Sequence, residues 1–239
     1  PLMSGMGAAI AVTEECDGVS GSVSHAALAP YAVWNSGVTT GTSGSFTTVS
    51  SDGVPDHCTS NVLRGWTGFP NSDNSNAIAS QSYTWAIPNT PAVEESGNHT
   101  RVPLGPIGVA LNGSPFYNVY DTNGNDSSIT EYSDDCNGHT QDQGKYHYHK
   151  NPKCTYIQAS GEHSPIVGYA FDGYPIYGPR DDDGVLVTTN DLDQYHGHEQ
   201  VNRGYHYHIT EDAPYVLGAY YKGVVHTGNF DALTSPPVS

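Results

Sequence analysis

The amino-acid sequence predicts a mainly β protein, an internally duplicated β-sandwich or barrel-like domain with long loops and little helix. Three observations support this prediction. The 239 residues include 27 Gly and 16 Pro, and no stretch free of them shows helical periodicity. Several short runs alternate with a period of two, which is typical of strands. A unit of about 60 residues occurs twice, which indicates duplication.

Two pairs of segments carry the duplication. Residues 108–117 (GVALNGSPFY) match residues 168–177 (GYAFDGYPIY) at five of ten positions, 60 residues apart. Residues 138–149 match residues 197–208 at seven of twelve positions, 59 residues apart. Both segments end in Tyr-His-Tyr-His. The shared order and spacing predict two copies of one strand, turn, loop and strand unit.

The chain is expected to contain four regions. Residues 1–103 carry no repeat and are predicted to pack on the core as strands and loops. Residues 104–160 form the first repeat, residues 161–226 the second, and residues 227–239 a C-terminal tail. The strand candidates are residues 45–49, 81–87, 107–111, 146–149 and 205–209.

The charge of the chain excludes some partners. Eight Lys and Arg stand against 25 Asp and Glu, a formal net charge of -17, so nucleic acid is not an expected partner. No segment has the roughly 18–20 consecutive apolar residues of a membrane span. Few Lys, four Cys and sequons at Asn98, Asn112 and Asn125 favour a secreted or cell-surface glycoprotein.

The cysteines are predicted to form disulfides. Cys136 and Cys154 both lie in the first repeat, and both are replaced at the matching positions of the second. Joint absence is what a bonded pair would show, so we expect a Cys136–Cys154 disulfide. The remaining residues, Cys16 and Cys58, are then expected to pair with each other.

The histidines form the candidate site. Residues two apart on a strand share one face, so His147 and His149 face together, as do His206 and His208. Another histidine lies eight residues before the first member of each pair. The predicted ligands of transition-metal ions, copper or zinc ahead of iron, are therefore His139, His147, His149, His198, His206 and His208. The spacing leaves open whether the two triads bind separate ions or converge.

Other polar residues are weaker candidates. His57 is a further candidate ligand, and Asp56, Asp135, Asn112 and Asp172 are candidates for orienting ligands or acting as a base. His163, His196 and His226 are candidates for extending a site, whereas His25 and His99 are not assigned to one. Two turns have the oxygen spacing of a calcium loop but lack its downstream Glu; their candidate ligands are Asp121, Asn123, Asn125, Asp181 and Asp183.

Three functions are compatible with these patterns. A bound metal with an open coordination position would activate water or dioxygen, as in a metal-dependent oxidoreductase or hydrolase. A non-catalytic module would sequester metal or bind a surface polysaccharide through Tyr and Trp. A filament or cell-surface building block would self-assemble, with metal-free histidine ladders. No nucleophile elbow, phosphate loop, dinucleotide fingerprint or HExxH motif is present.

The chain resembles the YHYH-domain family, named for the tetrapeptide at 146–149 and 205–208. The resemblance covers about residues 50 to 225. It implies a secreted or surface-associated protein without implying an activity, and it adds weight to His57, which lies in a matching motif. The matching segments are 52–57 (DGVPDH), 68–71 (GFPN) with Asn74 and Asn76, 106–113 (PIGVALNG), 135–139 (DCNGH), 168–179 (GYAFDGYPIYGP) and 214–218 (PYVLG).

Overall fold

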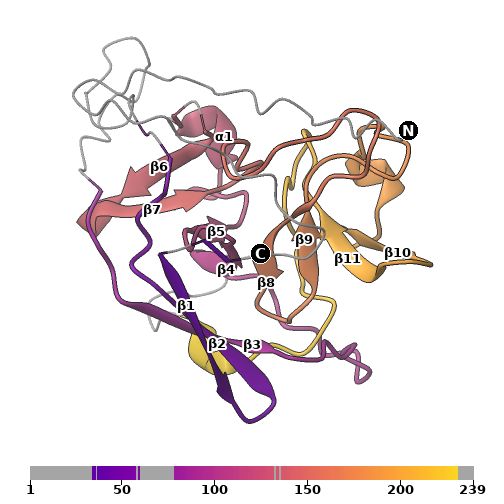
Figure 1. The fold of residues 1–239 in the computed structure, drawn as a ribbon, viewed down its shortest axis with the longest axis horizontal. Coiled ribbons are helices and arrows are strands. Elements are labelled where there is room, and N and C mark those ends of the chain that lie inside the picture. The colour runs from indigo at the N-terminus through magenta and orange to yellow at the C-terminus, as the bar shows by residue number, and fades with distance from the viewer. Residues whose placement is uncertain are drawn as a thin grey trace, which may run out of the picture.

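The computed structural model describes residues 34–35, 37–57, 59, 78–131, 133–134 and 136–230. Within these residues the protein is mainly β, as predicted, with a three-stranded and an eight-stranded sheet (Figure 1). The expected Cys16–Cys58 pair, Asp135 and most of the C-terminal tail lie outside the described residues.

The small sheet is an antiparallel meander of β1 (Val38–Ser43), β2 (Phe46–Ser51) and β3 (Tyr83–Pro88). Strands β2 and β3 confirm the two strand candidates of the N-terminal region within two residues. Strand β1 was not predicted, because its sequence VTTGTS has no apolar alternation and all but its first residue are exposed.

The large sheet contains both repeats. The first supplies β4 (Pro106–Ala110), β5 (Pro115–Tyr117), β6 (Gly138–Gln141) and β7 (Lys145–Tyr148). The second supplies β8 (Ile166–Ala170), β9 (Pro175–Tyr177), β10 (Gly197–Gln200) and β11 (Gly204–His208). Helical structure is limited to α1 (Ser127–Thr130) and the 3-10 turns η2 (Asp142–Gly144), η3 (Thr189–Asp191) and η4 (Thr227–Asn229) in the described residues.

The strand order of the large sheet is symmetric. It runs β10-β11-β9-β8-β4-β5-β7-β6, so that β4 and β8 meet at the centre. Outward from this centre, each half has its equivalent strands in the same order. The central register pairs Gly108 with Ala170 and Gly168 with Ala110, and these two pairs exchange when 60 is added or subtracted. The two repeats are therefore related by a pseudo-two-fold axis at the Val109–Tyr169 pair.

Two glycines permit the close approach of strands at this axis. A Cβ on Gly108 would lie 2.7 Å from the Tyr169 carbonyl oxygen, and one on Gly168 would lie 2.3 Å from the Val109 carbonyl oxygen. Real Cβ atoms do not approach backbone this closely, so both repeats need glycine here. The axis thus explains why this position is Gly in both copies.

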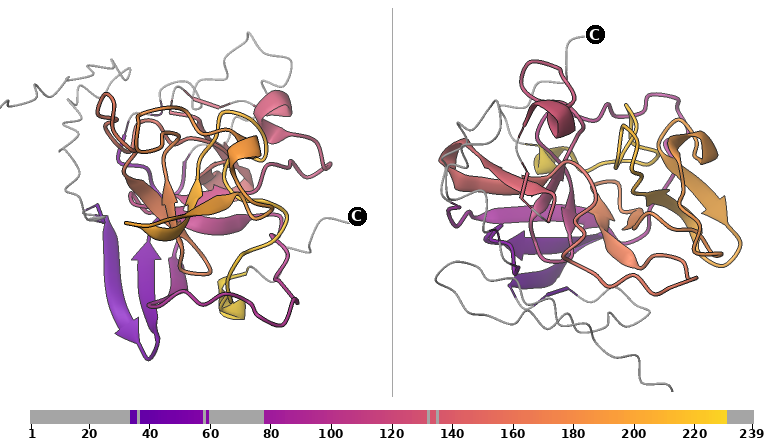
Figure 2. Two further views of the ribbon diagram at one scale, coloured as in Figure 1. Left: turned by 90° about the vertical axis from the view of Figure 1, so that its right-hand side faces the viewer. Right: turned by 90° about the horizontal axis from the view of Figure 1, so that it is seen from above.

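The two sheets pack on a common core. Trp85 of β3 contacts Phe171, which follows β8, with ring centroids 5.9 Å apart, and both side chains are buried. Figure 2 shows the small sheet covering one side of the large one. Among the described residues the large sheet ends at β6 and β10 and forms no closed barrel, so the arrangement is sandwich-like and not barrel-like. No helix in the described residues has the length and apolar character needed to cross a membrane.

Candidate metal centres

The β6–β7 hairpin assembles the first triad. Its antiparallel register places His139 directly opposite His147, and directly opposite residues share one face of a sheet. His149 follows two residues later on the same face. Their ligand nitrogens all lie within 4.8 Å of one another, and the Nε2 atoms of His147 and His149 are 3.0 Å apart. All three side chains are buried. His139 thus lies on a strand, and not in the loop where it was expected.

The β10–β11 hairpin assembles the second triad in the same way. His198 lies opposite His206, and their Nε2 atoms are 3.1 Å apart. The Nε2 atoms of His206 and His208 are 3.2 Å apart. His206 and His208 are fully buried, whereas His198 is half-buried.

The triads form two separate clusters. Strands β7 and β11 are separated by β5, β4, β8 and β9, so the clusters lie toward opposite edges of the large sheet (Figure 1). The geometry answers the question that the spacing left open, since no triad residue of one repeat can join the cluster of the other.

Backbone carbonyls fix the tautomers of the paired histidines. A carbonyl oxygen only accepts hydrogen bonds, so a ring nitrogen bonded to it carries the hydrogen. The Nδ1 atoms donate to the carbonyl oxygens of Lys145 (from His147, 3.1 Å), Asn118 (from His149), Gly204 (from His206, 2.9 Å) and Gly178 (from His208, 2.7 Å). Lys145 and Gly204 are equivalent in the two repeats, as are Asn118 and Gly178. The hydrogen bonds that orient these imidazole rings are therefore duplicated together with the triads.

This tautomer leaves the Nε2 lone pairs facing each other. A neutral imidazole has one N–H, already used at Nδ1, so the facing Nε2 atoms cannot hydrogen-bond to each other. Burial lowers the pKa of His149 and His206 to about 4 and that of His208 to about 3, so a shared proton is not favoured near neutral pH. A tetrahedral metal with bonds of about 2.0–2.1 Å would place two such nitrogens about 3.3 Å apart. The observed separations are close to that value.

A different fourth group lies beside each triad. Glu131, which follows α1, places its Oε2 atom 3.3 Å from Nε2 of His139 and 3.6 Å from Nε2 of His149. Burial raises the pKa of Glu131, and the negative charge of the nearby Asp121 raises it further. In the second centre, His163 has a ring nitrogen within 4.8 Å of those of His206 and His208. Glu131 was not predicted, because it lies outside the two matching segments that contain the triad histidines.

The tyrosine side chains of the two Tyr-His-Tyr-His motifs lie on the face of the strands opposite the histidines. Tyr148 accepts a hydrogen bond from the Asn112 amide (3.0 Å), and its counterpart Tyr207 donates to the Asp172 carboxylate (2.6 Å). These contacts correct the expectation that Asn112 and Asp172 orient histidine ligands. Asn112 is also buried, so its sequon is not accessible to a glycan, whereas Asn98 and Asn125 are exposed.

Two further carboxylates hold the first tyrosine of each motif. Tyr146 donates to Asp134 (2.8 Å), and Tyr205 donates to Asp193 (3.0 Å). Each carboxylate also accepts the backbone N–H of the glycine that begins the neighbouring strand, Gly138 or Gly197. The 59-residue offset between Asp134 and Asp193 is the signal in the sequence that could have identified them.

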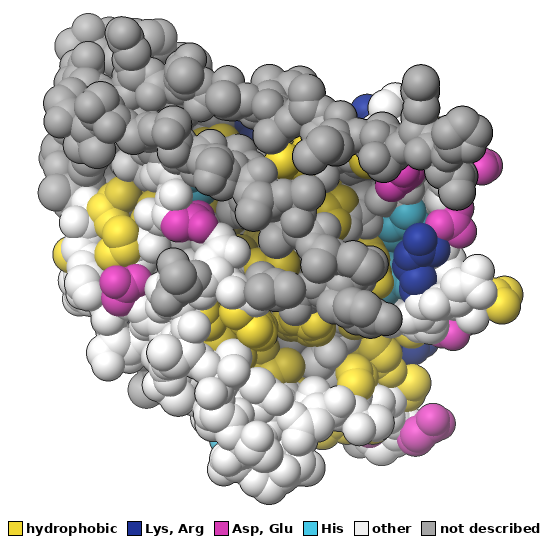
Figure 3. Space-filling view, in the orientation of Figure 1, with side chains coloured by type: hydrophobic (Ala, Val, Ile, Leu, Met, Phe, Trp, Pro, Cys, Tyr) yellow, Lys and Arg dark blue, Asp and Glu magenta, His cyan; other side chains and the backbone are white. Residues whose placement is uncertain are grey.

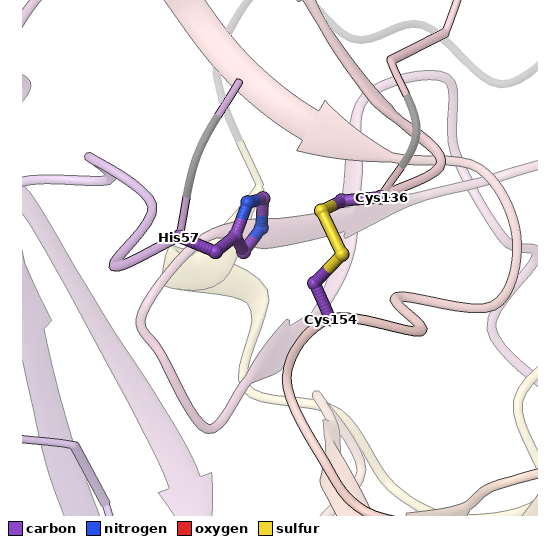
Figure 4. Close-up of side chains that lie close together, drawn as sticks. All are labelled: His57, Cys136 and Cys154. Carbon is purple, nitrogen blue, oxygen red and sulfur yellow. A yellow bond between two sulfur atoms is a disulfide. The ribbon is translucent and has the colours of Figure 1, made fainter. Parts of the chain in front are cut away.

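His57 lies on this tyrosine face and not with the triad. Its Nε2 is 2.5 Å from the Tyr148 hydroxyl, and its ring also contacts Tyr146. Figure 4 shows the imidazole beside Cys136 and Cys154, whose sulfurs are bonded to each other and so do not act as thiolate ligands. His57 is therefore separate from the triad, and its role as a metal ligand stays a prediction.

The predicted Cys136–Cys154 disulfide is confirmed. It closes a loop of 18 residues that contains β6, β7 and the complete first triad. The bond therefore restrains the segment that carries the first centre.

Replacing both cysteines by Ser is expected to destabilise the protein by about 3 kcal/mol, the loop entropy associated with a closure of this length. Urea denaturation of the oxidised protein and of the C136S/C154S variant would measure the difference. Equal unfolding midpoints would contradict a stabilising role. The far-UV circular-dichroism spectra of the two proteins without urea are the control for intact folding.

The remaining candidates have other contacts. Asp121 accepts the backbone N–H groups of Asn123 and Asn125, both at 2.8 Å, so its carboxylate stabilises its own turn. Asp181 accepts from the Gln200 amide, and Asp183 is exposed. Calcium at these turns stays a prediction.

The other polar candidates also lie apart from the triads. Asp56 is exposed and accepts from Asn112. His196 bonds the Val216 carbonyl oxygen (3.1 Å), and His226 accepts from the backbone N–H of Gly228. These contacts are those of structural residues.

The fold and the site together define a class: a duplicated β protein with a buried histidine cluster near each edge of its large sheet. Comparison with protein families gives a match to the YHYH protein family over residues 84–184, from β3 to the turn after β9. The chain therefore contains a YHYH domain over these residues, which confirms the resemblance seen in the sequence. No curated protein and no solved structure matches the chain.

Proposed function

We propose that the protein binds two transition-metal ions, copper or zinc ahead of iron, one at each histidine triad. We further propose that it does so outside the cytosol, as a secreted or cell-surface protein. The observation that carries the proposal is the pairing of buried Nε2 lone pairs, at 3.0 Å between His147 and His149 and at 3.2 Å between His206 and His208. A cation bound between them would remove the repulsion that the tautomers otherwise impose.

The surroundings of the triads suit neutral imidazole ligands. Each Nδ1 donor has a backbone acceptor, which orients the ring and makes Nε2 the ligand atom. Tyr117 stacks on His147 with centroids 3.9 Å apart, and Tyr177 contacts His206 at 4.7 Å, so the rings are also held by packing. The net charge of -17 would raise the local concentration of cations.

The two non-metal alternatives have less support. A polysaccharide platform needs exposed aromatic rings, but Trp85 and most tyrosines are buried, and only Tyr120 and Tyr220 are clearly exposed aromatics among the described residues. A metal-free histidine ladder needs hydrogen bonds between imidazoles. The Nδ1–carbonyl bonds of His147, His149, His206 and His208 leave these neutral rings no second N–H, so they cannot bond to one another.

An enzymatic form of this proposal is a metal-dependent oxidoreductase or hydrolase. For the hydrolase, a carboxylate must lie near the ligands to act as a base. Glu131 meets this condition with its 3.3 Å approach to His139, whereas Asp56 and Asp172 lie on the tyrosine face. The chemistry of an open coordination position, where one exists, would be supplied by the metal itself.

Elemental analysis tests the proposal. Protein loaded with zinc or copper and then desalted is expected to retain about two ions per chain. A chelator is expected to lower the melting temperature by about 10 °C or more, because ligand binding stabilises only the folded state. Fewer than 0.2 ions per chain, with a melting temperature that the chelator does not change, would overturn the proposal.

A further inference from the structure

We infer that the two centres differ in metal preference, because Glu131 completes the first and His163 completes the second. The inference rests on the proposed function and extends it. It assigns a three-histidine, one-carboxylate ligand set to one end of the sheet and a histidine-only set to the other.

The first centre has a carboxylate beside its histidines, whereas the matching carboxylate of the second repeat has other partners. Glu131 contacts both His139 and His149 through Oε2, at 3.3 and 3.6 Å. The residue 60 positions later is Asp191, whose Oδ2 accepts from the backbone N–H and the hydroxyl of Thr188, at 2.9 and 2.7 Å. The carboxylate of the second repeat is therefore used to cap η3.

The second centre has an imidazole that the first lacks. His163 donates from Nδ1 to the Ser164 carbonyl oxygen (2.7 Å), which leaves a lone pair on Nε2. This Nε2 is buried and has no hydrogen-bond partner among the described residues. Its ring lies 5.0 Å from that of His208 and 5.6 Å from that of His206. The residue 60 positions earlier is Pro103, which has no side-chain ligand atom.

The surface beside the second centre is charged. Asp181 and Asp182 have carboxylate oxygens within 4.8 Å of a His163 ring nitrogen, and Arg203 forms a 2.6 Å ion pair with Asp182. Figure 3 shows histidine side chains at the surface on the side of β9, β10 and β11, between basic and acidic side chains. Asp182 is paired with Arg203, and Asp181 accepts from the Gln200 amide, so both carboxylates are engaged outside the histidine cluster. Their charge would compensate that of a dication held by neutral imidazoles.

The two ligand sets predict different selectivity. A carboxylate reduces the net charge of a divalent centre from +2 to +1 and adds a hard oxygen donor, of the kind found in zinc and non-haem iron sites. Imidazole is a softer donor that binds copper as well as zinc, so a histidine-only set favours copper more than a set with a carboxylate does. Copper is expected to bind more tightly than zinc at both centres, as the Irving–Williams order requires. The inferred difference between the centres is in the ratio of copper affinity to zinc affinity. We expect this ratio to be larger at the second centre.

Each centre can be measured alone. The H206Q/H208Q background leaves the first centre and the H147Q/H149Q background leaves the second. Zinc and copper(II) affinities are measured by competition with a chromophoric chelator. In the first background, E131Q is expected to lower zinc affinity about tenfold or more and copper affinity less than about threefold. In the second, H163Q is expected to lower copper affinity about tenfold or more.

A variant that is expected to gain copper selectivity distinguishes a change of ligand from a loss of folding. E131H converts the first centre to histidines alone and is expected to raise its copper-to-zinc affinity ratio toward that of the second. E162Q, an exposed substitution beside His163, is the matched control and should change neither affinity.

The outcomes separate this inference from the proposed function. Two bound ions with equal copper-to-zinc ratios, unchanged by E131Q, E131H and H163Q, would overturn the inference and leave the proposed function standing. Absence of binding at both centres of the unsubstituted protein would overturn the proposed function itself.

Discussion

Replacing His147 and His149 together by Gln is expected to reduce bound metal from two ions per chain to one. The H206Q/H208Q variant should lose the other ion, and the fourfold variant should retain none. Each double substitution removes the facing Nε2 pair of one centre, and the centres lie near opposite edges of the sheet. The affinity of the altered centre should fall at least a hundredfold. Elemental analysis and cobalt(II) absorption spectra would measure the loss.

Tyr148→Phe provides the matched control. Tyr148 lies between the two histidines in sequence but on the opposite face, where its hydroxyl contacts His57 and Asn112. The variant should keep two ions and lose only stability. Retention of two ions by both double histidine variants would show that the triads are not the ligands.

Acidification is expected to destabilise the metal-free protein strongly between pH 6.5 and about 4. Burial lowers the pKa of His149 and His206 to about 4, that of His208 to about 3, and that of His147 well below its usual value. In the unfolded chain these groups titrate near 6.5. Below that pH the unfolded state binds more protons than the folded state, so stability is lost as pH falls.

Three acids oppose this trend, because burial raises the pKa of Glu131, of Asp134 and, to about 6, of Asp172. Protonation of Asp172 therefore stabilises the folded state as pH falls from about 6 to 4. The histidines with lowered pKa values, which also include His163 and His196, outnumber these carboxyl groups. The melting temperature of the metal-free protein should therefore fall by about 10 °C or more between pH 7 and pH 5.

Calorimetry at several pH values in the presence of a chelator would measure this loss. The H206Q/H208Q variant lacks two of the buried imidazoles, and its melting temperature should depend less steeply on pH. A melting temperature of the unsubstituted protein that stays constant from pH 7 to pH 5 would contradict the prediction.

The repeat made much of the fold predictable. Strands β4, β7 and β11 lie within one residue of the predicted runs 107–111, 146–149 and 205–209, and consecutive residues of each strand are buried, so both of its faces are covered. The order of the strands was not predictable, since the β4–β8 pairing at the axis depends on the close approach that Gly108 and Gly168 allow. A sequence pattern does not encode such a contact between distant segments.

Some residues of the candidate site could be predicted from the sequence, and others could not. The six triad histidines follow from strand geometry and hairpin register, both of which are local. Glu131 and His163 reach the clusters from segments outside the hairpins, and neither is repeated, so spacing gave no signal for their position. His57 lies near the correct strand but on the tyrosine face.

The pseudo-two-fold axis between β4 and β8 has an evolutionary consequence. Its reciprocal register is that of an isologous contact, in which one surface of a subunit pairs with the same surface of an identical copy. The present chain is thus equivalent to a homodimer whose subunits have been fused in tandem. In a true homodimer every mutation appears twice. Fusion removed that constraint, and one half could acquire a carboxylate while the other acquired an imidazole.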